Sequence, residues 1–479
     1  MAEPQYDVAI IGGGVIGCSV ARELSRFRLR SVMLERNAEV GFGTSKTNSG
    51  IIHPGHDTPL STLKGQLVVR GNALFDQLSA ELGFGFRRIG QLNVAFTEAE
   101  LATLQALKAQ GDDKGVPGLE LWDRERLRRE EPNLSLALLG ALYAPSAGVI
   151  NPYEFAFALI ENAVDNGLSL RVESPVERIE RSAAGLRLTT PHGVVSCRFA
   201  LNCAGVYSDM VAELAGCRDF TIRPRKGEEY MLDKRLQGLV RHLIFPVPTP
   251  ASKGTLIIPT FDGTLMVGPT AEDTDDRGDL TTTYEGSDKV FAFIRRICPS
   301  ITERDTITEF AGLRPVSDTD DFIIGPTRVK GFINVAGIQS PGLTAAPAIA
   351  EHVLGILKGE RLPLEPRDDF RPRTPGTPHF AALDPEERER LIAEDPRYGR
   401  VVCRCELVTE AEVHRAIDHG ARTLDGIKFR TRAGMGRCQG GFCTTRCMDI
   451  LAERLKKPFH EITKRGEGSW IATPMTDDA

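Results

Sequence analysis

One stretch near the N-terminus constrains the fold of this chain more than any other. The β-rich run Tyr6–Ile11 ends in the glycine turn Gly12–Gly17, and residues 18–27 follow with a helical pattern. This order is typical of a dinucleotide-binding unit, in which glycines allow a tight turn and bring the backbone close to a pyrophosphate. A second strand is expected at residues 31–34, and it ends at Glu35, where a carboxylate can accept hydrogen bonds from ribose hydroxyls. The sequence therefore predicts an α/β domain that binds a nucleotide cofactor.

Length and charge limit the class of protein further. The chain has 479 residues, 41% of them hydrophobic, so it can bury a large core and form more than one domain. The formal net charge of −6 and the pI of about 6.0 give no electrostatic reason to expect a polyanion as a partner. No stretch combines dense Lys and Arg with stacking aromatic residues. We therefore expect no nucleic-acid partner.

No targeting or membrane segment is predicted. The sequence begins Met1-Ala2-Glu3-Pro4 without basic residues, and its first apolar run, Val8–Ile11, is too short for a signal-peptide core. No segment approaches the roughly 20 apolar residues that are needed to cross a bilayer. We expect a cytoplasmic protein that associates with a membrane only through a partner subunit.

Three further segments carry a family resemblance. Residues 43–55 form a long polar, glycine-rich stretch, and loops of this length are usually functional. Together with residues 202–209 and 337–344, this stretch resembles the D-amino-acid-oxidase-like family of flavoproteins over residues 5 to about 360. The glycine turn alone does not separate FAD from NAD, whereas the resemblance implies FAD.

The resemblance implies a Rossmann-like FAD-binding domain of the GR2 type, interleaved with a β-sheet substrate domain. The substrate layer would hold the substrate against the flavin and exclude water. The expected FAD-binding segments are about 1–81, 143–220 and 307–360, and the expected substrate-domain segments are about 82–142 and 221–306, with strands at 254–259 and 264–268. The residues expected to contact FAD are Gly12, Gly14, Val15, Ile16, Gly17, Glu35, Arg36, Thr44, Ser45, Asn48, Ser49, Gly50, Ile51, Val176, Ala204, Gly205, Gly337, Gly342, Leu343 and Thr344.

Within that family the sequence is most similar to FAD-dependent glycerol-3-phosphate dehydrogenases and oxidases. The similarity is carried by Ser49-Gly50-Ile51-Ile52-His53, Ala311-Gly312-Leu313-Arg314-Pro315 and Ser340-Pro341-Gly342-Leu343. It implies that His53 is a general base near the flavin. It also implies that Arg314, Lys253 and Ser340 hold a substrate phosphate. A guanidinium can clamp phosphate through two hydrogen bonds, and a lysine adds a point charge.

Each of these side chains also has a simpler interpretation. His53 can be a loop histidine that is bonded to backbone, and Arg314 can bridge two domains. Lys253 can be solvated beside a glycine, and Ser340 can cap a helix without binding a ligand. The basic run Arg223–Lys226 is interpreted as solvated.

Cysteine spacing predicts a second module towards the C-terminal end. Five of the ten cysteines lie between Cys403 and Cys447, and in a reducing compartment such crowding favours a metal site over disulfides. The preceding residues 361–399 are rich in proline and charge and are expected to form a semi-extended linker. A module is then expected at 400–460, with a helix starting in a capping box at Thr409, followed by a tail at 461–479.

The expected metal ligands are the close pairs Cys403/Cys405 and Cys438/Cys443. Four thiolates suit either a [2Fe-2S] cluster or a tetrahedral zinc ion, and zinc sites more often use CxxC pairs. Residues 430–440 resemble the [2Fe-2S] domain of the bacterioferritin-associated ferredoxin type, which implies a small α-rich cluster domain. Cys447 is either a substitute ligand or a spare thiol. Nearby arginines are expected to offset the negative charge of a cluster: Arg404, Arg430, Arg432 and Arg437.

Two classes of function follow. The first is a dehydrogenase that oxidises glycerol 3-phosphate, a small anionic substrate, and passes electrons through the cluster to a flavoprotein reductase or a membrane iron-sulfur subunit. A 2-hydroxy acid such as L-2-hydroxyglutarate, or a secondary amino acid such as proline, is the alternative substrate. The second class is a non-catalytic redox or assembly subunit.

Overall fold

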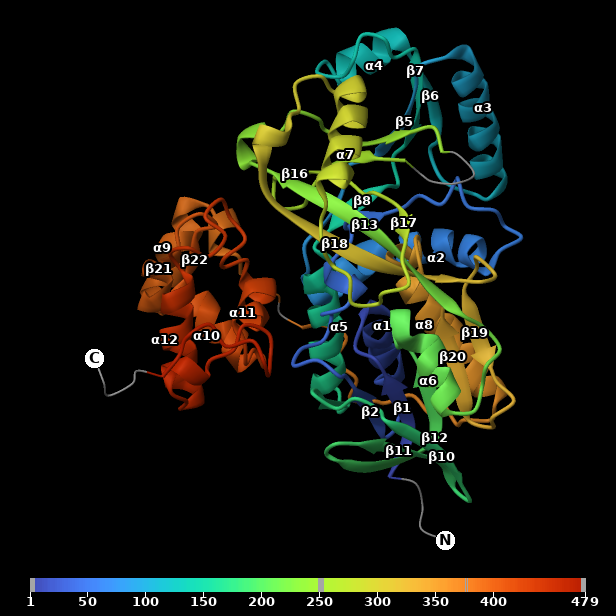
Figure 1. Cartoon of the computed structure of the whole chain (residues 1–479), viewed down its shortest axis with the longest axis vertical. Coiled ribbons are helices and arrows are strands. Elements are labelled where there is room, and N and C mark those ends of the chain that lie inside the picture. The colour runs from blue at the N-terminus through green and yellow to red at the C-terminus, as the bar shows by residue number, and fades with distance from the viewer. Residues whose placement is uncertain (1–4, 249–253, 375, 377, 475–479) are drawn as a thin grey trace.

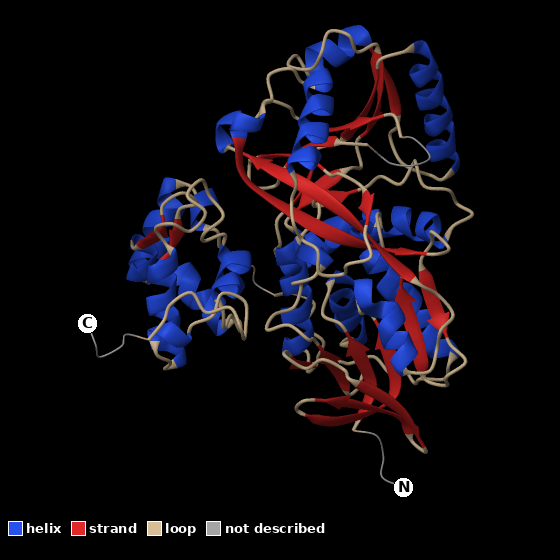
Figure 2. Ribbon diagram, in the orientation of Figure 1, coloured by secondary structure: helices blue, strands red, loops and turns tan. Residues whose placement is uncertain are grey.

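The computed structural model describes residues 5–248, 254–374, 376 and 378–474. The fold is α/β, as expected. Two sheets with their covering helices form the body of the protein, and a small, mostly helical module follows at the C-terminal end (Figures 1 and 2).

The first sheet forms the dinucleotide-binding domain. β1 (Tyr6–Ile11) lies between β2 (Ser31–Leu34) and β12 (Gly193–Asn202), and both pairings are parallel. The strands β1 and β2 are almost continuously apolar because helices cover both faces of a parallel sheet. The other strands of this sheet are β9 (Ser169–Arg171), β10 (Arg178–Ser182), β11 (Gly185–Thr190), β19 (Ile323–Pro326) and β20 (Phe332–Ala336).

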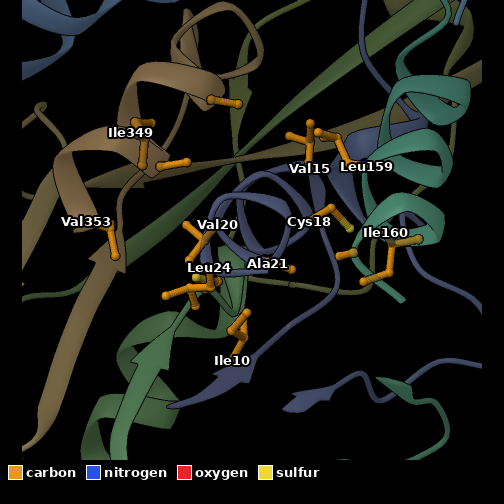
Figure 3. Packing of buried hydrophobic residues seen from close by; sticks show 14 of the residues in the cluster. Ile10, Val15, Cys18, Val20, Ala21, Leu24, Leu159, Ile160, Ile349 and Val353 are labelled. Carbon is orange, nitrogen blue, oxygen red and sulfur yellow. The ribbon is translucent and has the colours of Figure 1, made fainter. Parts of the chain in front are cut away.

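Helix α1 (Val15–Leu24) follows the glycine turn directly. It begins about one turn earlier than the pattern predicted, since Gly14 is already its N-cap. α1 packs between α5 (Pro152–Asp165) and α8 (Gly342–Gly359), and α2 (Leu63–Leu82) packs on α8. Figure 3 shows the side chains that fill this core, among them Ile10, Cys18, Leu159, Ile349 and Val353.

The second sheet forms the other domain. Its strands are β5 (Gln91–Ala95), β6 (Glu120–Asp123), β7 (Gly140–Ala144), β13 (Ile222–Leu232), β14 (Leu243–Pro246), β15 (Leu256–Pro259), β16 (Leu265–Gly268), β17 (Glu272–Asp273) and β18 (Thr306–Ser317). Its helices are α3 (Glu98–Asp113), α4 (Arg124–Glu130) and α7 (Tyr284–Ile297). A small sheet of β3 (Ile51–Ile52), β4 (Phe86–Arg88) and β8 (Gly148–Ile150) and the helix α6 (Ser208–Leu214) complete the body.

The strand β18 corrects one expected domain boundary. The sequence placed residues from 307 onwards in the dinucleotide-binding domain, yet β18 pairs with β13 antiparallel along its whole length and belongs to the second sheet. β7 likewise extends the second sheet just past the expected boundary at 142. Both shifts have the same cause, because strand pairing between distant segments, not local composition, decides which sheet a strand joins.

The C-terminal module contains α10 (Glu410–Asp418), α11 (Leu424–Thr431) and α12 (Thr444–Leu455), with a short pair of strands, β21 (Val401–Cys403) and β22 (Val408–Thr409). The capping box is present: the Thr409 hydroxyl accepts from the Glu412 N–H, and the Glu412 carboxylate accepts from the Thr409 N–H. The module has its own apolar core, formed by side chains such as Val413, Ile427 and Leu451.

The segment 361–399 is not extended throughout, and this corrects the expected linker. Its second half forms α9 (Pro385–Glu394), which starts in a capping box at Asp384 with a proline in its first turn. Phe380, just before that helix, stacks on Tyr398, just after it. The local capping signals therefore outweigh the high proline content. Among the described residues, no helix combines the length and apolarity needed to cross a bilayer.

Candidate active site

A cavity of about 850 Å³ lies where the two sheets meet. The glycine turn, the loop 43–49 and the start of α8 line it from the dinucleotide-binding side, and β13 and β18 line it from the second sheet. Sixteen of the residues expected to contact FAD line this cavity: Gly12, Gly14, Val15, Ile16, Glu35, Arg36, Thr44, Ser45, Asn48, Ser49, Ile51, Val176, Ala204, Gly205, Gly342 and Leu343.

The glycine turn is shaped for close approach of a ligand. Gly12 has φ +104°, and a Cβ there would lie 2.6 Å from the Cys203 carbonyl oxygen. A Cβ on Gly17 would lie 2.1 Å from the Gly12 carbonyl oxygen, so Gly17 lets α1 pack against the turn. Gly14 leaves the N-terminus of α1 open towards the cavity, and the N–H groups and helix dipole there favour a negatively charged group.

Glu35 is fixed at the end of β2 as the sequence predicts. Its Oε2 accepts a hydrogen bond of 2.7 Å from the Gly13 N–H, and its Oε1 accepts from the backbone and side chain of Asn37. Burial raises the pKa of Glu35, while these N–H donors act in the opposite direction. The carboxylate oxygens keep further lone pairs, so ribose hydroxyls can still donate to them.

Four expected contact residues do not line the cavity and instead support it. Gly17 packs behind the turn, and Gly50 and Gly337 have positive φ, which glycine adopts without strain. Thr344 holds His53, because its Oγ1 accepts from the His53 backbone N–H at 2.9 Å. Sequence motifs do not separate such supporting residues from ligand contacts, since both kinds lie in the same short segments.

Tyr207 is a cavity residue that was not singled out from the sequence. The Arg36 guanidinium lies 3.9 Å from the centroid of the Tyr207 ring, and both side chains line the cavity. Tyr207 lies within the segment 202–209 that carried the family resemblance, which was the available signal. The stacked pair provides a flat surface beside Glu35.

His53 and Ser340 come together although 287 residues separate them. Ser340 Oγ lies 3.5 Å from His53 Nε2, and the His53 ring meets Phe245 edge-on with 6.0 Å between the ring centroids. The His53 carbonyl accepts from Asn72 Nδ2 at 2.9 Å, so this residue is held from two sides. Ser340 does not cap α8, whose N-cap is Pro341 without a side-chain bond.

Arg314 lines the same cavity from β18. Its Nη2 donates to the Thr270 carbonyl at 3.0 Å, and burial lowers the pKa of the guanidinium. No carboxylate forms a salt bridge with Arg314 within the described ranges. Lys253, the other expected phosphate ligand, lies outside the described residues. A partly buried guanidinium that lines a cavity is suited to a small anion.

Glu229 on β13 is a second cavity residue that was not singled out. Its Oε1 accepts from Ser49 Oγ at 2.7 Å, and its side chain is buried. Burial raises the pKa of Glu229 to about 7, against the opposing effects of the Ser49 bond and the charge of Arg314. In sequence, the pair Glu228-Glu229 looks like an exposed acidic pair, and only the fold brings Glu229 to the cavity.

The four thiols of the C-terminal module gather as two pairs. Cys405 and Cys438 lie with their sulfur atoms 3.5 Å apart, and Cys403 is hydrogen-bonded to Cys443. Within the described residues, no group of three or more His, Cys, Asp or Glu is placed to hold a single metal ion. Two dithiol pairs suit a group with two iron atoms better than one zinc ion. Cys447 packs in the apolar core of the module, as a spare thiol does.

Backbone donors around the thiols also fit an iron-sulfur cluster. The pKa of Cys438 is lowered, first by its hydrogen bond with Cys405 and then by the N–H groups of Phe442, Gly440 and Gly441. N–H donors that point at sulfur stabilise the thiolate form that iron requires.

Arginines of the module bind the body of the protein, which corrects the role expected for them. Arg430 is partly buried and pairs with Glu39 and Glu161 of the dinucleotide-binding domain at 2.9 and 3.2 Å. Arg432 is partly buried too and pairs with Asp262 of the second domain. These two guanidinium groups are neutralised by carboxylates, so they fasten the module to the body instead of offsetting cluster charge.

The fold and the cavity define a dinucleotide-binding oxidoreductase that carries a thiol-rich module. Residues 7–354 match the FAD dependent oxidoreductase family, and residues 401–453 match the BFD-like [2Fe-2S] binding domain. The chain therefore belongs to the FAD-dependent oxidoreductase family, and it carries a [2Fe-2S]-binding domain at its C-terminal end. FAD and the cluster are the cofactors of these two parts, and the residues described above fit both.

Similar proteins share this arrangement to different extents. A glycerol 3-phosphate dehydrogenase of Caloramator mitchellensis is 44% identical over 474 residues, covering 98% of this chain and 99% of its own length. A glycerol 3-phosphate oxidase of Mycoplasma pneumoniae is 30% identical, covering 73% of this chain and 94% of its own. The solved L-alpha-glycerophosphate oxidase of Mycoplasma pneumoniae, with FAD bound, has a TM-score of 0.73 and 29% identity and covers 78% of this chain and 99% of its own. The match with the Caloramator mitchellensis protein extends over the thiol module as well.

Proposed function

We propose that this chain is a dehydrogenase that oxidises sn-glycerol 3-phosphate to dihydroxyacetone phosphate and delivers the electrons through its [2Fe-2S] domain to a partner protein. The observation that carries the proposal is the shared cavity of His53, Ser340 and Arg314, which lies next to the glycine turn. The full-length similarity to a protein named glycerol 3-phosphate dehydrogenase supports the same substrate.

The side chains have distinct tasks in this proposal. Arg314 and Ser340 hold the phosphate, since one offers a desolvated cation and the other a hydroxyl at the start of α8. His53 accepts the proton of the secondary alcohol, because an imidazole can take up a proton near neutral pH. Thr344 and Asn72 fix the His53 backbone, so the ring starts in a defined position. Bound FAD supplies the two-electron oxidation of the carbinol carbon.

The electron exit is proposed to be the thiol module. Cys405 is exposed and Cys438 is partly exposed, so a cluster held there lies close to the surface, where a partner can approach it. A flavoprotein reductase and a membrane iron-sulfur subunit are both suitable acceptors, and the second would bring the protein to a membrane surface.

An anaerobic titration of the purified holoenzyme tests the substrate. Glycerol 3-phosphate is expected to bleach the visible flavin absorbance, and His53→Gln is expected to slow the bleaching by about 100-fold or more. Arg314→Ala should raise the substrate concentration that is required for half-maximal bleaching. Arg223→Ala, which removes an exposed arginine from β13, should change neither the rate of bleaching nor this concentration.

The titration also separates the alternatives. Bleaching by L-2-hydroxyglutarate or proline, but not by glycerol 3-phosphate, would show that the substrate is wrong. A flavin that none of the three compounds bleaches would favour the non-catalytic redox or assembly subunit.

A further inference from the structure

One face of the β13–β18 pair forms a wall of the cavity. On β13 the residues Arg225, Gly227 and Glu229 alternate towards the cavity, and on β18 Gly312 and Arg314 do the same. Alternate residues of a strand point to the same face, so this set follows from the register, in which Gly227 lies opposite Gly312 and Arg225 opposite Arg314. The Arg314 guanidinium packs over Gly227, where a Cβ would lie 2.2 Å from its Nη2.

The neighbouring residue Glu228 points to the other face and is fully bonded. Its carboxylate accepts from Tyr230 Oη and from the N–H and hydroxyl of Thr283, next to the start of α7. Glu228 therefore has a structural task that needs no ligand. The adjacent pair of glutamates is split between two environments by the pleat of the strand.

Glu229 is bonded at only one of its two oxygens. Its side chain is 3% exposed, Oε1 is bonded to Ser49, and Oε2 has no hydrogen-bond partner among the described residues. A buried polar atom without a partner costs about 1–3 kcal/mol. Oε2 is covered by protein atoms, but Glu229 lines the cavity, so a turn of the carboxylate on binding would let a ligand there supply the missing partner.

We propose that Glu229 selects the substrate, by forming a hydrogen bond between its Oε2 and a neutral hydroxyl next to the reacting carbon, and by disfavouring a carboxylate at that place. This inference rests on the proposed function. In glycerol 3-phosphate the carbinol carbon carries a hydroxymethyl group on one side and the phosphomethyl group on the other. In a 2-hydroxy acid a carboxylate replaces the hydroxymethyl group.

The charges around the cavity support a substrate with one anionic end. Arg225 is held by Asp273 at 2.6 Å, whereas Arg314 forms no salt bridge among the described residues and can bind the phosphate. A carboxylate placed beside Glu229 would meet a like charge in a buried site, which is costly. A hydroxyl can donate to the ionised carboxylate or accept from the protonated carboxyl, so it matches Glu229 on either side of its pKa of about 7.

Three matched compounds test the inference on the holoenzyme. They share the phosphate and the secondary alcohol and differ only beside it: glycerol 3-phosphate has a hydroxymethyl group, propane-1,2-diol 1-phosphate a methyl group, and 3-phosphoglycerate of the matching configuration a carboxylate. The wild type is expected to prefer the first over the second by about 10- to 100-fold in the second-order rate constant of flavin reduction. The third should be the poorest.

Variants at position 229 then test whether Glu229 causes this preference among the three compounds. Glu229→Leu is expected to bring the first two compounds within about threefold of each other, because the hydrogen bond is gone. Glu229→Gln should keep the preference for the hydroxyl and improve the rate with 3-phosphoglycerate by about tenfold or more, because the like charge is removed. Glu309→Gln, at an exposed position of β18, is the control and should behave as the wild type. Dissociation constants from the perturbed flavin spectrum should follow the same order.

Two results would overturn the inference. One is a wild type that reduces its flavin equally fast with the hydroxymethyl and methyl compounds, and the other is a Glu229→Leu variant that folds, retains FAD and keeps the wild-type preference. If Glu229→Leu does not fold, an unchanged rate of Glu229→Gln with 3-phosphoglycerate overturns it. Failure of the proposed function looks different, since none of the three phosphates would then bleach the wild-type flavin, and that result would overturn both.

Discussion

The Lys46 ammonium lies 5.1 Å from the centroid of the Phe429 ring. Lys46 ends the short 3₁₀ turn Thr44–Lys46 in the cavity-lining loop, and Phe429 belongs to α11 of the thiol module. The same ammonium lies 4.3 Å from the centroid of the Phe42 ring, which meets Phe429 edge-on. This cluster joins the wall of the flavin cavity directly to the module that carries the cysteines.

The burial of Lys46 predicts a pH-dependent stability. Burial lowers the pKa of Lys46 to about 8 from its ordinary 10.5, so the unfolded chain binds more protons than the folded chain between these two values. The free energy of unfolding should therefore rise with pH across that window, by about 3 kcal/mol at most. Lys46→Met, which keeps contact with both rings, should lose this rise.

Urea unfolding at pH 7.5 and pH 10, with the wild type and Lys46→Met compared at each pH, measures this contribution. Subtracting the change in unfolding free energy of Lys46→Met from that of the wild type removes the contribution of groups that titrate in both proteins. Equal changes with pH in the two proteins would contradict the assignment.

Arg432 should be required for docking of the module. It donates to Tyr153 Oη at 2.8 Å and pairs with Glu406 at 2.9 Å and with Asp262. Arg432→Met leaves Asp262 without its cation and Glu406 with Lys234 alone, so it should destabilise the docked state by about 3 kcal/mol. Faster limited proteolysis within residues 361–399 would report undocking. Arg404→Met, at an exposed position, should leave the cleavage rate unchanged.

The pairing of the thiols predicts which cysteines hold iron. Cys405→Ser should abolish the [2Fe-2S] absorbance and circular dichroism while the FAD content stays the same, because the cavity lies in another domain. Cys447→Ser should retain two irons per chain, since Cys447 is buried in the module core and a serine only weakens its packing. Loss of iron from Cys447→Ser alone would reverse the roles given to these residues.

Substitution of Gly17 in the glycine turn should cause a sharp loss of bound FAD. Gly17→Ala places a Cβ 2.1 Å from the Gly12 carbonyl oxygen, which forces α1 away from the turn and should leave a protein purified with little FAD. Gly355→Ala in α8 meets nothing within 4 Å and should retain FAD, with a stability equal to the wild type or higher by up to about 1 kcal/mol. The ratio of flavin to protein absorbance after gel filtration measures both.

Local patterns sufficed for several elements. The strand at residues 31–34, the capping box at Thr409 and the grouping of His53 with the flavin loop all depend on signals within a few residues. The helix at residues 18–27 was placed about one turn late, because a glycine turn and the first turn of a helix share the same residues.

Other features depend on partners far away in the chain. Arg430 and Arg432 were interpreted as charges beside a cluster, yet each also pairs with a carboxylate of the body that lies more than 160 residues away in the chain. Glu229 was not singled out from the sequence at all, because burial of a strand face is decided by what packs on it and not by the strand itself.

The sequence by itself determined the dinucleotide unit, the thiol module and the chemical class of both, because short fixed spacings of glycine and cysteine carry those functions. Only the tertiary structure decided that Glu229 and Arg314 lie on one wall of the same cavity and that two arginines fasten the module to the body. Contacts of this kind form between segments that are distant in the chain, and no local pattern records which of them will meet.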